Sequence, residues 1–202
     1  MLGILETLET FYKKDPAAKS HYEILLYPTF YSIVLHRISH YLWKKGFFIM
    51  ARLVANLNRF ATGVEIHPNA MIGRRNIFDH GMGTVIGETA IIGEDCLIYQ
   101  GVTLGGKSFE KNTKRHPTIG NHVILGAGAK IIGNIQIGSD SIVGSNSVVT
   151  KSFPENSKIV GVNLNLNKKS TLIEVEEIST RENILEKFLN HFHLENAPTI
   201  LY

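Results

Sequence analysis

Aliphatic side chains recur at every sixth position through the middle of the chain. The series begins at Ile66, slips by two residues after Phe78, and resumes at Ile86 and again at Ile119 after a longer gap. Each position in the series holds Ile, Leu, Val or Phe: Ile66, Ile72, Phe78, Ile86, Ile92, Ile98, Leu104, Ile119, Leu125, Ile131, Ile137, Val143 and Val149. Glycine often follows directly, and a small or β-branched residue usually stands two positions earlier. The middle of the chain is therefore an internal repeat with a period of six residues.

This period predicts a mainly β protein built on a parallel β-helix. A helix cannot use it, because 3.6 residues per turn would rotate the apolar positions around the cylinder. Each helical glycine would also cost about 1 kcal/mol relative to alanine. In a β-helix, each hexad is one short strand and a turn, and three hexads close one triangular coil. The aliphatic side chains then point inward and stack about 4.8 Å apart along the axis.

The two flanks differ from the repeat, because 15 of the 18 aromatic residues lie outside residues 62–152. Residues 1–62 are predicted to form a helical cap, with helices over 1–13, 29–45 and 47–60. Asp15 and Pro16 have the chemistry of a helix start, which predicts a further helix there. Residues 63–162 are the solenoid, with a protruding loop at 105–118. Residues 163–202 are a tail with an amphipathic helix, whose apolar stripe is Ile184, Leu185, Phe188, Leu189 and Phe192.

Charge and cysteine content exclude several classes of protein. The formal net charge is +3, and no short window is densely basic, so a nucleic-acid partner is not expected. The longest apolar stretches, such as residues 46–51, are far shorter than the roughly 18 residues of a membrane span. The first 14 residues do not read as a secretion signal. The single cysteine, Cys96, excludes an internal disulfide framework and suits a reducing cytoplasm.

The two departures from the period are the candidate functional segments. Residues 79–85 include Asp79 and His80, and residues 105–118 include Arg115 and His116. Regular hexads form only the flat faces of a solenoid. Segments that depart from the period protrude as loops, and loops tend to carry function.

Several motifs resemble the bacterial serine O-acetyltransferases, a family within the hexapeptide-repeat acyltransferases. The resemblance covers about 15–161, and its narrowest part is the ordered run of Asp79-His80-Gly81, Gly101-Val102-Thr103-Leu104-Gly105-Gly106 and Arg115-His116-Pro117. It implies a left-handed β-helix that assembles as a homotrimer with active sites between subunits, and helical caps that can join two trimers. It also implies acetyl transfer from acetyl-CoA to the hydroxyl of L-serine, which gives O-acetyl-L-serine for cysteine biosynthesis.

The resemblance assigns roles to residues of the two departures and to two carboxylates outside them. His80 matches the general base, and histidine suits that task because its ordinary pKa lies near 6.5. Glu65 stands where the family has the Asp that orients this base. Asp15 and Asp79 match the groups that bind the serine ammonium, and Arg115 with His116 matches those that bind its carboxylate. An Arg fork is suited to a carboxylate because it binds both oxygens.

Acetyl-CoA is the expected co-substrate, and no metal is expected. Gly105 and Gly106 let backbone N–H groups approach the thioester carbonyl. The small residues Ala127, Gly128 and Ser145 leave room for the pantetheine arm. The lysines that could meet the nucleotide phosphates are Lys130, Lys168 and Lys169. Many family members end in Ile, which docks into O-acetylserine sulfhydrylase; this chain ends in Tyr202, which makes that complex doubtful.

Other functions stay open from the sequence. The acceptor could be a sugar or another hydroxyl compound, although a neutral sugar needs neither Asp79 nor Arg115. A zinc lyase of the carbonic anhydrase type would need three converging histidines from His67, His80, His116 and His122. A solenoid that serves only as a scaffold is the remaining alternative. Cys96 falls on an inward position of its hexad, so it is not expected to be a nucleophile.

Overall fold

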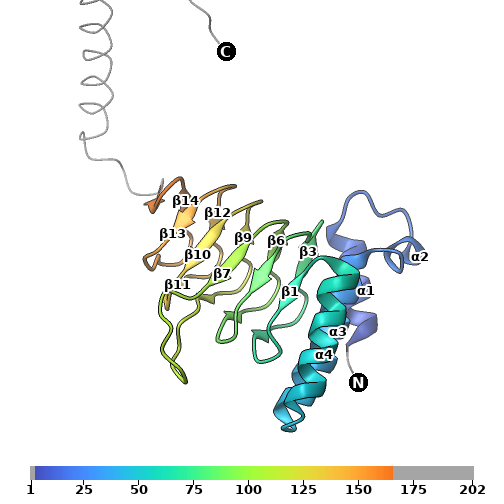
Figure 1. Cartoon of the computed structure of the whole chain (residues 1–202). Helices are drawn as coiled ribbons and strands as arrows, with labels where there is room; N and C mark the ends of the chain where they lie inside the picture. The colour runs from blue at the N-terminus through green and yellow to red at the C-terminus, as the bar shows by residue number, and fades with distance from the viewer. Residues whose placement is uncertain (1–2, 166–202) are drawn as a thin grey trace, which may run out of the picture. The chain divides into compact units, whose positions relative to one another are not determined.

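The computed structural model describes residues 3–165 and confirms the parallel β-helix (Figure 1). Its short strands form three sheets, one on each side of a triangular coil. The first sheet contains β1 (Glu65–Ile66), β4 (Val85–Ile86), β7 (Thr103–Gly105), β10 (Lys130–Ile132) and β13 (Val148–Val149). The second contains β2 (Met71–Ile72), β5 (Ile91–Ile92), β8 (Thr118–Ile119) and β11 (Gln136–Ile137). The third contains β3 (Ile77–Asp79), β6 (Leu97–Tyr99), β9 (Ile124–Leu125), β12 (Ile142–Val143), β14 (Lys158–Val160) and β15 (Leu164–Asn165).

The register between coils shows where the period is interrupted. Val85 pairs with Thr103, one regular coil of three hexads further along the chain. Glu65 pairs with Val85, so the first coil is two residues longer. Thr103 pairs with Lys130, and this coil is longer still because it contains the loop before Thr118. All these pairings are parallel, and only the terminal strand β15 runs antiparallel to its neighbour. The departures from the period thus leave the pairing of the coils intact.

The solenoid core is the predicted stack of aliphatic side chains. Twelve of the thirteen hexad positions are at most 2% exposed, and Phe153 and Ile159 continue the stack beyond Val149. Ile72, on the edge strand β2, is the one stack position that is only partly buried. Cys96 is fully buried, as its inward position predicts. Burial of a large aliphatic side chain contributes about 1.5–3 kcal/mol, so this stack is the main source of stability.

Within residues 3–165, four helices cover one end of the solenoid (Figure 1). They are α1 (Ile4–Lys14), α2 (His21–Ile24), α3 (Pro28–Lys44) and α4 (Phe48–Thr62). Both longer predicted helices are confirmed, and Gly46 and Gly63 follow their ends with positive φ angles of 84° and 71°. The apolar side chains Phe11, Ile24 and Phe30 join the solenoid core. Helices and solenoid therefore share one core.

The prediction of a helix starting at Asp15 is wrong. Asp15 ends α1, since its backbone N–H still donates to the Phe11 carbonyl. Its side chain then accepts from the Ala17 N–H at 2.8 Å, which makes a tight turn instead of a helix start. The next helix begins later, with Ser20 as its cap. The amphipathic helix predicted in the tail, and Lys168 and Lys169, lie outside the described residues.

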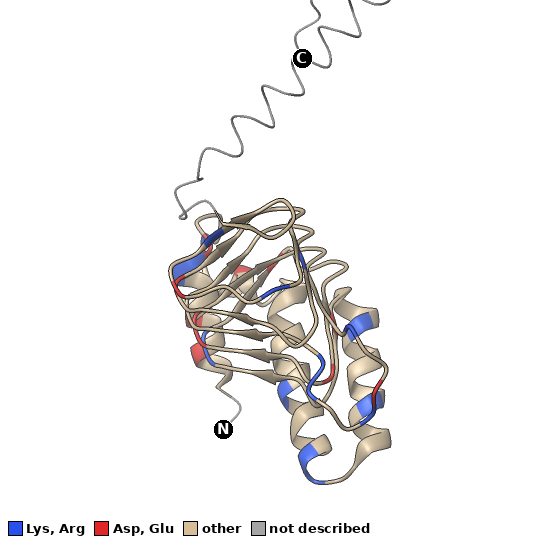
Figure 2. Cartoon of the chain, turned by 90° about the vertical axis from the view of Figure 1, so that its left-hand side faces the viewer, with Lys and Arg blue, Asp and Glu red and all other residues tan. Residues whose placement is uncertain are grey.

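Charged side chains are scattered over the helices and the solenoid rather than gathered on one face (Figure 2). The largest ionic cluster ties the cap to the coils: Arg75 pairs with Asp95 at 2.8 Å, and Arg74 pairs with Glu6 of α1 at 2.8 Å. Among residues 3–165, no helix is both long and apolar enough to cross a membrane.

Candidate active site

The first departure from the period lines a cleft of about 530 Å³ between the helical cap and β3. We call it the His80 cleft. Its polar side chains come from Lys14, Asp15, Tyr27, Thr29, Asp79, His80 and Tyr99, and Phe11, Ile77 and Leu97 are among its apolar walls. Three of the residues predicted from the sequence are therefore brought together although Asp15 lies far from Asp79 in the chain.

The slip of two residues makes the sharp turn that presents His80. His80 has a φ angle of 56°, and Gly81 follows with 63°. A Cβ at Gly81 would lie 2.5 Å from the Thr29 side chain, so only glycine fits between cap and solenoid here. The His80 side chain remains 76% exposed, with Nε2 at 3.9 Å from Asp79 Oδ1. The imidazole is thus open to exchange protons with a ligand.

Tyr27 is a residue of this cleft that the sequence reasoning missed. Its side chain hydrogen-bonds Asp15, and burial followed by this bond raises the pKa of Tyr27 to about 12. The phenol therefore stays protonated and donates to the Asp15 carboxylate. Its only sequence signal is its place directly before Pro28, the first residue of α3.

The second departure lines a separate cleft of about 210 Å³, which we call the Arg115 cleft. Its polar side chains are those of Arg52, Asn56, Arg59, Glu65, His67, Glu88, Arg115 and His116. Arg115 pairs with Glu88 at 2.7 Å, and Glu65 pairs with Arg59 at 3.2 Å. The structure therefore places Glu65 with Arg115 and not with His80, the residue that it was expected to orient.

His116 is held in one protonation state. The backbone N–H of Thr89 donates to His116 Nδ1 at 3.2 Å, and a backbone N–H cannot accept. The ring is 7% exposed, and its burial, followed by the nearby Arg115 and Lys114, lowers the pKa of His116. The neutral ring therefore carries its proton on Nε2. A Cβ at Gly87 would lie 2.0 Å from this ring, so glycine is needed beneath it.

Two further histidines have lowered pKa values: His67, which lines the Arg115 cleft, and the buried His36 of α3. Burial, followed by Arg52, lowers the pKa of His67 to about 4. Burial lowers the pKa of His36 to about 3, although the His36 ring hydrogen-bonds the backbone of Ala70 in the same turn as His67. Two imidazoles with lowered pKa values, those of His67 and His116, thus line a cleft whose charges come from Arg and Glu.

Comparison with known proteins agrees with this architecture. Residues 116–151 match the family model described as bacterial transferase hexapeptide (six repeats). The serine acetyltransferase of Helicobacter pylori strain 26695 is 49% identical over 80% of this chain and 94% of its own length. The chain belongs to the serine acetyltransferase family. A Synechococcus elongatus relative of the same name is 51% identical over 75% of this chain, but the match spans 62% of that longer protein.

Solved structures of the family share the fold. The serine acetyltransferase of Neisseria gonorrhoeae superposes with a TM-score of 0.77 and 39% identity over 81% of this chain and 66% of its own. A second structure of it, in complex with serine, has a TM-score of 0.72 and 39% identity, covering 78% of this chain and 64% of its own. The enzyme of Brucella abortus in complex with coenzyme A has a TM-score of 0.77 and 36% identity, with coverages of 81% and 66%.

In this family member, the residues predicted to contact acetyl-CoA fall into two groups. One follows a glycine corner of the solenoid, formed by Gly83, Gly101, Gly128 and Asn146 in successive coils. Gly101 and Gly128 have φ angles of 69° and 72°, and a Cβ at Gly128 would lie 2.3 Å from Asn146 Oδ1. Ala127 and the exposed Ser145 are beside this corner.

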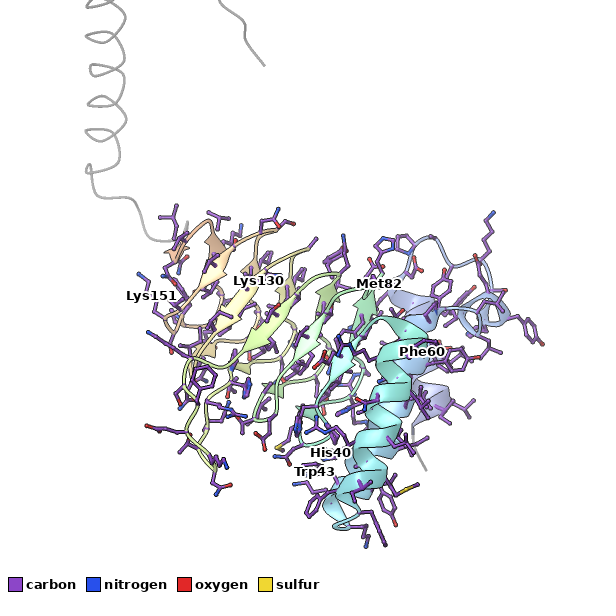
Figure 3. All side chains as sticks on the ribbon, in the orientation of Figure 1. His40, Trp43, Phe60, Met82, Lys130 and Lys151 are labelled. Atoms are coloured by element: carbon purple, nitrogen blue, oxygen red, sulfur yellow. The ribbon has the colours of Figure 1, made fainter. Side chains whose placement is uncertain are left out.

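Lys130 belongs to this first group, and Gly105 and Gly106 of the loop form the second group. Lys130, labelled in Figure 3, projects from β10, and its Nζ donates to the Gly101 carbonyl. It therefore lies against the glycine corner. Gly106 lies beside His116, since a Cβ at Gly106 would lie 3.3 Å from His116 Nε2, whereas Gly105 pairs with Ile132 of β10 in the first sheet.

Three other candidates from the sequence can be placed among the described residues: the Cys96 thiol, a metal site and His122. Burial raises the pKa of the Cys96 thiol to about 11, so it is a poor nucleophile. No three His, Cys, Asp or Glu side chains in residues 3–165 converge as metal ligands. His122 is exposed on another corner, beside Asp95 and Asp140.

Proposed function

We propose that this protein transfers the acetyl group of acetyl-CoA to the hydroxyl of L-serine, giving O-acetyl-L-serine for cysteine biosynthesis in the cytoplasm. The family membership supports this activity. Among the superposed relatives, the Neisseria structure is a complex with serine and the Brucella structure is a complex with coenzyme A. These two complexes support L-serine and acetyl-CoA as the substrates of this chain.

The proposal depends on one observation: the groups that suit the ammonium of serine lie in one cleft, and those that suit its carboxylate lie in the other. The His80 cleft supplies two carboxylates, Asp15 and Asp79, which suit an ammonium group. The Arg115 cleft supplies a guanidinium and the neutral N–H of His116, which suit a carboxylate. The two clefts have no lining residue in common within one chain. We infer that a homotrimer joins the His80 cleft of one copy to the Arg115 cleft of its neighbour.

In this arrangement His80 acts as the general base. It takes the proton of the serine hydroxyl while the serine oxygen bonds to the thioester carbon. The carbon–sulfur bond then breaks, and the protonated imidazole returns its proton to the leaving thiolate. The exposure of His80 gives the substrate access to its ring nitrogen. General base catalysis of this kind contributes about 10²–10⁴-fold to the rate.

Glu65 reaches its expected role only across the subunit boundary. It lies in the Arg115 cleft of its own chain, so it would orient the His80 ring of the neighbouring copy. Its pairing with Arg59 is an exposed contact, with the two side chains 65% and 47% exposed. Such pairs are weak, so Glu65 can exchange Arg59 for an imidazole.

The backbone around Gly105 and Gly106 is proposed to donate to the thioester oxygen as negative charge develops there. Ala127, Gly128 and Ser145 border the proposed path of the pantetheine arm, and Lys130 stands beside it. Without Cβ atoms at Gly101 and Gly128, an extended chain can approach the backbone of this corner closely.

The helical cap offers a surface for association of two trimers. Four large apolar side chains of α4 follow one stripe and are mostly exposed: Ile49, Leu53, Leu57 and Phe60. Phe60 is 92% exposed and is labelled in Figure 3. An apolar stripe of this size on a helix is typical of an interface. We propose that it is covered by a second copy. Tyr202 lies outside the described residues, so the expectation that this chain does not dock into the sulfhydrylase stays a prediction.

The acceptor is tested by thiol release from acetyl-CoA with L-serine, L-homoserine and a panel of simple sugars. We expect turnover with L-serine far above the others, because only an amino acid uses both clefts. Turnover with a sugar and none with serine would contradict the proposal and support the alternative acceptor.

The base is tested with a matched pair of variants. His80→Ala is expected to lower kcat by about 10²–10⁴-fold. His122→Ala is the control, because His122 is also an exposed corner histidine, with a φ angle of 55° against 56° for His80. It should retain the parent kcat. Equal thiol release by the two variants would rule out the role of His80.

A further inference from the structure

Two adjacent residues of the preceding coil, Glu88 and Thr89, hydrogen-bond to the end of the protruding loop. Arg115 and His116 both donate their backbone N–H groups to Thr89 Oγ1, at 3.0 and 3.1 Å. The same hydroxyl lies 2.9 Å from His116 Nδ1. Beside it, the Glu88 carboxylate holds the Arg115 guanidinium at 2.7 Å. These contacts join residues 26 or 27 positions apart in the chain.

The bonding capacity of the Thr89 hydroxyl is used completely. A hydroxyl has two acceptor lone pairs and one donor hydrogen. The two backbone N–H groups occupy the lone pairs, which leaves the hydrogen to donate to His116 Nδ1. The Thr89 backbone N–H also donates to that nitrogen. Thr89 therefore fixes both the backbone position of His116 and the ring nitrogen that carries the proton.

We propose that Thr89 is a positioning residue for recognition of the substrate carboxylate. It sets His116 with Nε2–H as donor and sets the backbone from which the Arg115 side chain starts, while Glu88 holds the guanidinium. Thr89 does not contact the substrate. This inference rests on the proposed function, because it assigns the Arg115 cleft to the carboxylate of serine.

The geometry makes the hydroxyl of Thr89, rather than its methyl group, the functional part. Removal of the hydroxyl would leave two backbone N–H groups at a half-buried loop end without an acceptor. Unpaired buried donors are costly, so the loop end would move to find new partners. Arg115 and His116 would move with it, and the fit to a carboxylate would be lost.

A pair of variants at this position separates the hydroxyl from the shape of the side chain. Thr89→Val keeps the shape and removes the hydroxyl, whereas Thr89→Ser keeps the hydroxyl. We expect Thr89→Val to raise KM for L-serine about tenfold, with KM for acetyl-CoA and kcat close to the parent values. Thr89→Ser should restore the parent KM for serine. An unchanged KM in Thr89→Val, equal impairment of both variants, or a parallel rise in KM for both substrates would overturn the proposal.

Hydrogen exchange measured by mass spectrometry tests the hydrogen bonds from the loop end to Thr89 without a catalytic assay. A peptide that contains Arg115 and His116 should be protected in the parent and in Thr89→Ser and should exchange faster in Thr89→Val. Unchanged exchange in Thr89→Val would also overturn the proposal. If the parent does not acetylate serine, the proposed function fails, and the exchange pattern still decides whether Thr89 grips the loop.

Discussion

The two clefts of this chain use histidine in opposite ways. In the His80 cleft the imidazole is 76% exposed beside carboxylates, at the tip of a sharp turn. In the Arg115 cleft, His67 and His116 are at least half-buried, and their pKa values are lowered. A base must gain and lose a proton in each reaction cycle, which requires access. A positioning or binding imidazole must keep one protonation state, and burial enforces that.

The comparison also shows how a repeat produces two kinds of site. The first coil adds two residues, which is enough for a turn that places His80 over the cap. The loop coil adds a longer segment, whose free end needs anchoring by Thr89 and Glu88. Both departures keep the parallel pairing of the coils, so the solenoid continues past each functional segment.

The largest expected effect is the loss of activity in a variant of either cleft and its recovery when the two variants form mixed trimers. His80→Ala and Arg115→Ala should each lower kcat/KM for serine by at least about 100-fold, since one removes the base and the other the carboxylate partner. If each site joins the two clefts of neighbouring copies, unfolding and refolding the two variants together should restore activity, because some sites then contain both parent residues.

The control for mixing is each variant refolded alone under the same conditions, which should stay inactive. Mixed trimers without recovered activity would show that both clefts must come from one chain, and the inferred subunit arrangement would be wrong.

The pH dependence of stability tests whether burial keeps a histidine neutral, and His36 is the most buried example. Folding lowers the pKa of His36 from its ordinary 6.5 to about 3. The stability from a neutral His36 is fully present above pH 6.5 and is lost as pH falls toward 3, because the unfolded chain binds a proton that the folded chain excludes. Between pH 7 and pH 5, His36 should account for a loss of about 2 kcal/mol in the free energy of unfolding.

Denaturant unfolding at fixed protein concentration measures this loss. His36→Gln should show a shallower decline between pH 7 and pH 5 than the parent, and His122→Gln, at an exposed corner, should decline like the parent. Identical slopes for the parent and His36→Gln would contradict the buried neutral state of His36.

The smallest expected effect concerns the exposed ion pair of the Arg115 cleft. Arg59→Ala should change the free energy of unfolding by less than about 1 kcal/mol, because both side chains of the Arg59–Glu65 pair are largely in water. Arg75→Ala is the contrasting variant, since Arg75 makes several contacts with Asp95, which is only 19% exposed. Thermal or denaturant unfolding compares them; a larger loss for Arg59→Ala would show that Glu65 has a structural role.

The pattern of the sequence was sufficient for the solenoid, its inward positions and the two long helices of the cap. Hexad spacing decides which residues face the core, and hydrophobic burial enforces that choice at almost every position. The two departures were visible because glycine and polar residues replace the aliphatic series there. Cys96 could be assigned to the core for the same reason.

Only the tertiary structure decided how functional residues are grouped. Spacing did not show that Glu65 shares a cleft with Arg115, that Asp15 ends a helix beside Tyr27, or that Thr89 holds His116. These contacts join corners of different coils, or a corner and the cap, and they depend on how many residues each coil contains and on the hydrogen bonds that align the coils. Local sequence determines the face on which a side chain lies, whereas the stacking of coils determines what lies beside it.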